Sequence, residues 1–145
     1  MAITTTAPDT TSQSLLEQID TGVLLRIHAG AFFGPQIYYK IWSFRGITQF
    51  LEMAGFYPAP VWVVLAGVVE TLVAIGLVFN IGAKYAALAA IGVLAVAAGA
   101  VVRVRGLGWL FNHGGIEYHV FWLLICFYVF VNEWQKRPGL LPRAS

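Results

Sequence analysis

A single carboxylic acid, Glu70, stands near the middle of an otherwise apolar run from Val61 to Phe79. A run of about 20 apolar residues in helical form is long enough to cross the hydrocarbon core of a bilayer. A charged carboxylate at that depth costs about 3 kcal/mol on insertion scales and more in simulations, so it normally has a partner or a function. The chemistry of this sequence therefore depends on which other polar groups lie beside Glu70.

Two sets of polar residues are expected to approach Glu70 from opposite sides. Because neighbouring spans alternate in direction, Glu70 is expected roughly 13 Å below the face at which the first span ends with Lys40. One set, on the first span, would form an intramembrane ion pair: Arg26 or His28. The other set would form a polar cavity that opens at the Lys40 face: His113, Glu117, Tyr118 or His119. These residues together form the candidate buried polar network.

Three roles are open for this network. It could clamp helices together and bind nothing, form a proton relay or a pocket for a quinone headgroup, or contact another membrane subunit. In a catalytic role, Glu70 and Glu117 are the candidate proton acceptors, with Arg26 or Lys40 holding positive charge nearby.

No intrinsic metal or haem site is expected. His113, Glu117 and His119 cannot share one helical face, and their spacing matches no common zinc pattern. His28 and His119 would lie at different depths, and the sequence has no CxxCH motif for haem attachment. No residue is assigned as catalytic, and a quinone is the one cofactor considered.

The composition indicates an integral membrane protein. Hydrophobic residues make up 59% of the 145 residues and charged residues 11%, against about 25% charged in an average soluble domain. The net charge of +2 comes without a basic cluster, which argues against nucleic-acid binding. Cys126 is the only cysteine, so no intramolecular disulfide can form.

Four hydrophobic segments predict an all-α, four-helix up-down bundle, because backbone groups in lipid must be hydrogen-bonded within each segment. The expected helices cover about residues 21–42, 60–79, 85–102 and 116–131. They form one transmembrane domain, 21–135, between a polar N-terminal tail, 1–20, and a C-terminal tail, 136–145.

The first loop is predicted to contain a short amphipathic helix. Its apolar residues recur at spacings of three and four: Phe44, Ile47, Phe50, Leu51 and Ala54. The loop lysines and arginines divide evenly between the two membrane faces. Arg26, on the side of the termini, tips the balance toward cytoplasmic termini.

The chain resembles the DoxX family of small four-helix membrane proteins from about Gly22 to Val131. Leu24-Leu-Arg26-Ile-His-Ala-Gly30 is similar to the opening signature of the family, and the stretch from Val68 to Leu77 is similar to its second-helix pattern of Glu followed by Gly and Leu. Asn80-Ile-Gly-Ala-Lys84 suits the hairpin that follows, and Gly114-Gly-Ile-Glu-Tyr118 is similar to the motif that opens the last helix. One departure is that Lys40 follows Gly34 by six residues, more than the family spacing.

The resemblance implies a membrane subunit associated with a quinone-linked redox complex, acting as an anchor or docking subunit. By the same resemblance, Arg26, Glu70 and Glu117 form the polar interior, and any catalytic part belongs to a quinone-linked oxidoreductase. The alternative is a non-catalytic assembly or structural subunit of another membrane complex. The implied partners are other membrane subunits and the lipid bilayer, in the inner or plasma membrane of a bacterium or archaeon.

Overall fold

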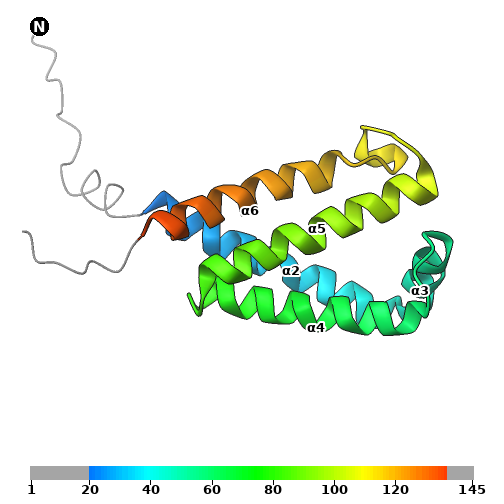
Figure 1. The fold of residues 1–145 in the computed structure, drawn as a ribbon, viewed down its shortest axis with the longest axis horizontal. Coiled ribbons are helices and arrows are strands. Elements are labelled where there is room, and N and C mark those ends of the chain that lie inside the picture. The colour runs from blue at the N-terminus through cyan, green and yellow to red at the C-terminus, as the bar shows by residue number, and fades with distance from the viewer. Residues whose placement is uncertain (1–19, 137–145) are drawn as a thin grey trace, which may run out of the picture.

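The computed structural model describes residues 20–136, which contain five α-helices, one short 3-10 helix and no strand (Figure 1). The α-helices are α2 (Thr21–Trp42), α3 (Phe44–Met53), α4 (Ala59–Val78), α5 (Ala83–Arg105) and α6 (Glu117–Gln135). The 3-10 helix, η1 (Phe111–His113), lies in the connection before α6. The all-α prediction is therefore confirmed for the described part of the chain.

The helices lie close to the expected segments. The short helix predicted in the first loop is α3, and the four long helices coincide with the four hydrophobic runs. The largest difference is at the end of α6, which continues to Gln135 instead of ending near residue 131. The polar residues of this last turn thus belong to the helix, although they lie beyond the apolar run that predicted it.

Local sequence signals explain where several helices start. The Asp20 carboxylate accepts a hydrogen bond of 2.8 Å from the backbone N–H of Gly22 and so caps α2. Prolines 58 and 60 stand at the start of α4, where no intrahelical N–H bond is lost. Pro35, in contrast, lies inside α2, where it removes one backbone hydrogen bond.

The four long helices pack around a narrow core. Helix α2 contacts α4 and α6, α5 also contacts α4 and α6, and α3 packs against α4. Figure 1 shows α3 and the η1 connection at one end of the molecule, and the start of α2 with the end of α6 at the other. We call these the α3 end and the terminal end. The core side chains are Ala29, Phe33, Val73, Leu77, Ala87, Ala90, Leu94, Trp122, Cys126 and Val129.

The outer faces of the long helices remain apolar. By length and composition, α4 and α5 are the two described helices that could cross a membrane, and only 28% and 22% of their most apolar windows are buried. Among the exposed large side chains of α4 and its C-cap, six recur every three or four residues: Val61, Leu65, Val68, Leu72, Ile75 and Phe79. This spacing forms a continuous apolar stripe along the helix, which we call the α4 stripe.

The register between α2 and α4 is set by a close approach at Gly30. A Cβ atom added there would lie 2.8 Å from Val78 Cγ2 and 3.1 Å from the Ala74 carbonyl oxygen. Small residues permit such close contact between helix backbones, where dispersion forces supply much of the attraction between membrane helices. Gly30 therefore fixes which turns of the two helices face each other.

Gly30→Leu should lower the free energy of unfolding by about 2–3 kcal/mol, because the added side chain overpacks the α2–α4 contact. Gly92→Leu is the matched control, since a Cβ atom at that helical position meets nothing within 4 Å. Reversible unfolding in detergent micelles, followed by circular dichroism, measures both variants. Equal destabilisation of the two would contradict the proposed role of Gly30.

Candidate functional site

Glu70 is paired with Lys40. The Lys40 Nζ atom donates to both carboxylate oxygens of Glu70, at 2.7 Å to Oε1 and 2.8 Å to Oε2. The Glu70 side chain is 5% exposed and that of Lys40 17%. A buried charge held this closely by an opposite charge costs far less than an unpaired one, so the pair accounts for the presence of Glu70 in its apolar helix.

The helix register explains this pairing, which neither expected partner set included. Gly30 faces the turn from Ala74 to Val78, and the two helices are antiparallel. Ten residues beyond Gly30, Lys40 therefore lies about four residues, or ~6 Å, from the level of Glu70. Helical side chains lean toward the N-terminus of their helix, so Lys40 reaches back across that distance. Counting from the helix ends assumes that these ends lie at one level. That assumption overestimates the distance between Lys40 and Glu70.

A second polar contact lies one turn away on α2. The Gln36 Nε2 atom donates to the Tyr118 hydroxyl of α6 at 2.9 Å. Lys40 and Gln36 are four residues apart and therefore share one face of α2. Through these two side chains α2 holds α4 on one side and α6 on the other. We call Gln36, Lys40, Glu70 and Tyr118 the polar layer.

Arg26 and His28 do not join the polar layer. Arg26 is buried at the terminal end, and its Nε atom lies 4.0 Å from Glu133 Oε1 on α6. His28 stacks on Trp122 with ring centroids 6.0 Å apart. The antiparallel packing of α2 on α6 explains the position of Arg26, because it brings the first turns of α2 beside the last turns of α6. The expected ion pair of Arg26 or His28 with Glu70 was therefore wrong.

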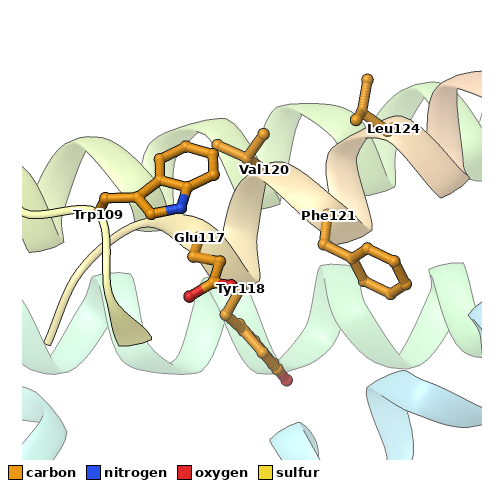
Figure 2. A pocket seen from close by; sticks show the side chains of 6 residues that line it. All are labelled: Trp109, Glu117, Tyr118, Val120, Phe121 and Leu124. Atoms are coloured by element: carbon orange, nitrogen blue, oxygen red, sulfur yellow. The ribbon is translucent and has the colours of Figure 1, made fainter. Parts of the chain in front are cut away.

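The second expected set surrounds the start of α6. Glu117 and Tyr118 line an open hollow of about 480 Å³, together with Trp109, Val120, Phe121 and Leu124 (Figure 2). In Figure 2 the Trp109 side chain, from the connection before α6, lies beside the first turns of that helix. His113 is exposed and His119 half-buried. Of this set, Tyr118 belongs to the polar layer, where its hydroxyl accepts from Gln36.

Gln36 and Glu133 are the polar residues that the sequence analysis missed. Gln36 lies one turn before Lys40, so its spacing from that residue was a usable signal. Glu133 was overlooked because it lies beyond the apolar run that defined the last span. An acidic residue at the level of Arg26 on an antiparallel helix was the signal in this case.

Removing the positive partner should expose the cost of the buried carboxylate. Lys40→Met should lower the free energy of unfolding by about 3–5 kcal/mol, because Glu70 is left unpaired. The double variant Lys40→Met/Glu70→Gln should recover a large part of this loss, since no charge then remains buried. Unfolding in detergent micelles measures the cycle, with Arg45→Met, at an exposed position on α3, as the control. Additive effects of the two single substitutions would show that the pair is not coupled.

Comparison with protein families places these helices in a known group. The family model for DoxX matches residues 22–104, which is more than half of the chain and includes Arg26, Lys40 and Glu70. The motif from Gly114 to Tyr118 lies outside the matched residues. Comparison with curated proteins gave no match, and comparison with solved structures gave none.

The family match and the two apolar helices α4 and α5 point to a membrane protein. The source membrane and the orientation of the termini stay predictions. Because the matched residues make up more than half of the chain, the chain belongs to the DoxX family.

Proposed function

We propose that this protein spans the membrane as a four-helix bundle and serves as an anchor or docking subunit of a quinone-linked redox complex. The observation that carries the proposal is the α4 stripe, whose six large side chains are 43% to 69% exposed. An apolar surface of this length indicates contact with lipid or with another membrane helix. The bundle thus offers a surface for a neighbouring subunit, and family membership makes a redox complex the first candidate.

The Lys40–Glu70 pair supports a docking role over a catalytic one. Both carboxylate oxygens of Glu70 accept from the same ammonium group, so the carboxylate is already neutralised by its partner. A proton acceptor needs an oxygen within reach of the proton that it takes. The pair is better suited to fixing α2 against α4, which keeps the outer faces of the bundle in a constant arrangement.

The hollow beside α6 supports quinone contact as a second candidate function. Its volume of about 480 Å³ falls within the range of about 300–1,000 Å³ that is usual for small-molecule sites. Its lining residues are mostly apolar and aromatic, and Trp109, Glu117 and Tyr118 among them carry polar groups. Such a lining suits a flat, mostly apolar ring that carries hydrogen-bonding oxygens.

Cysteine accessibility tests the membrane-spanning part of the proposal. In a Cys126→Ala background, which contains no other cysteine, we expect Leu72→Cys to resist a water-soluble maleimide in opened membrane fragments. Leu72 is 64% exposed in the protein itself, so only lipid or a partner helix can shield it. Glu52→Cys, at an exposed position on α3, should react and serves as the control. After denaturation in SDS both should react, and rapid labelling of Leu72→Cys in intact membranes would exclude a span at α4.

Purification from its own membranes in mild detergent tests the docking role. We expect subunits of a quinone-linked oxidoreductase to copurify with the full chain. Glu70→Gln should lower the yield of this complex, because the loosened α2–α4 contact disturbs the docking faces, while turnover for each assembled complex stays unchanged. The reverse result, normal yield with lowered turnover, would assign a catalytic role to Glu70. If no redox subunit copurifies, the non-catalytic alternative in another membrane complex replaces the proposal.

A further inference from the structure

A second hollow lies at the terminal end, between the start of α5 and the end of α6. Its volume is about 700 Å³, and unlike the hollow beside Glu117 it has cationic side chains in its wall. Lys84 of α5 and Lys136 at the end of α6 both line it, with Glu133 and Trp134 between them along the chain. We call it the α5–α6 hollow.

The charges around this hollow do not cancel. Lys136 Nζ lies 3.1 Å from Glu133 Oε1 and 3.3 Å from Asp20 Oδ2. The Nε atom of Arg26 lies 4.0 Å from the same oxygen of Glu133. Donation to Glu133 raises the pKa of Lys136, which keeps that side chain charged at neutral pH. Three cations, including Lys84, thus face two carboxylates. Among the described residues at this end, the positive charges therefore exceed the negative charges by one.

Lys84 holds this remaining charge. Between residues 20 and 136 it forms no ion pair with a carboxylate, and its Nζ atom lies over two aromatic rings, 4.9 Å from the centroid of Tyr85 and 5.4 Å from that of Trp134. A lysine ammonium held over aromatic rings in a hollow, with no carboxylate bound to it, is available to an anion. It is therefore the side chain on which recognition would depend.

The backbone adds further donors at the same place. Helix α5 starts in the wall of the hollow, and its N-cap, Gly82, adopts a φ of 59° and supplies no side chain to accept from the first N–H groups. Uncapped N–H groups at the start of a helix favour an anion, which the helix dipole also stabilises.

Next to Glu133, too, hydrogen-bond donors exceed acceptors among the described residues. Arg26 is 6% exposed, and within residues 20–136 its Nε and Nη1 atoms have no hydrogen-bond partner. The Nδ2 atom of the neighbouring Asn132 likewise lacks an acceptor there. Among residues 20–136, these buried donors at the terminal end are thus left without an acceptor oxygen.

We propose that the α5–α6 hollow binds the phosphate group of an anionic lipid headgroup. A phosphodiester carries one negative charge, which matches the one unbalanced positive charge among the residues between 20 and 136 at this end. Tryptophan and tyrosine favour the headgroup level of a membrane, and basic hollows between helix ends are suited to lipid phosphates. The inference rests on the membrane span in the proposed function, but not on the docked complex.

Native mass spectrometry of the full chain in detergent tests the site by titration with phosphatidylglycerol and, separately, with phosphatidylcholine. We expect phosphatidylglycerol to bind at least fivefold more tightly. Lys84→Gln should remove about fivefold of this affinity, which corresponds to one lysine near an anionic surface, and Lys84→Arg should retain it. Arg45→Gln, at an exposed cation on α3, is the matched control and should bind like the unchanged protein.

Each contrary result has a distinct meaning. Equal binding of the two lipids, or no loss in Lys84→Gln with its circular dichroism unchanged, would overturn the proposal. Displacement of the lipid by millimolar inorganic phosphate would keep a phosphate site but overturn the lipid as its source. Because the assay contains no partner subunit, copurification of the redox complex succeeds or fails independently of it.

Discussion

The buried carboxylate of Glu70 sets the main constraint on this fold. An unpaired charge inside an apolar helix would cost several kcal/mol, so the partner cation must be in place whenever the bundle is assembled. Lys40 meets this requirement from the last turn of α2, at 2.7 Å and 2.8 Å from the two oxygens. The pairing is compatible with few arrangements of α2 on α4, because a rotation of α2 that carried Lys40 away would leave the carboxylate alone. Close packing at Gly30 and charge pairing at Lys40 therefore select the same register.

The two ends of the bundle differ in chemistry. The α3 end contains the polar layer, in which side chains satisfy one another across three helices. At the terminal end, the described residues have an excess of donors and cations around Arg26 and Lys84. A satisfied layer stabilises the bundle and has little left to offer a ligand, whereas an unbalanced one has binding capacity. This contrast is the reason for assigning a structural role to the polar layer and the lipid phosphate to the terminal end.

The sequence predicted the helices more reliably than their contacts. Apolar runs of sufficient length identified the long helices because burial in lipid depends on composition along one segment, and the three- and four-residue spacing from Phe44 identified α3 in the same way. The partner of Glu70 could not be obtained by counting from the helix ends. It depends on the offset between α2 and α4, which is set by a contact at Gly30 between two distant segments. The partner of Arg26 was missed for a simpler reason, since α6 continues as a helix past the end of its apolar run to Glu133.

Pro35 gives α2 an uneven stiffness along its length. It lies between Arg26, which belongs to the terminal end, and Lys40, which belongs to the α3 end, and it removes a backbone hydrogen bond between them. Helices bend most readily at such a position. A displacement of the first turns of α2, for example on a change of charge at the terminal end, is therefore absorbed as a bend near Pro35 before it reaches Lys40. The two ends of the molecule are therefore coupled less stiffly through α2 than they would be through a helix with an unbroken hydrogen-bond ladder.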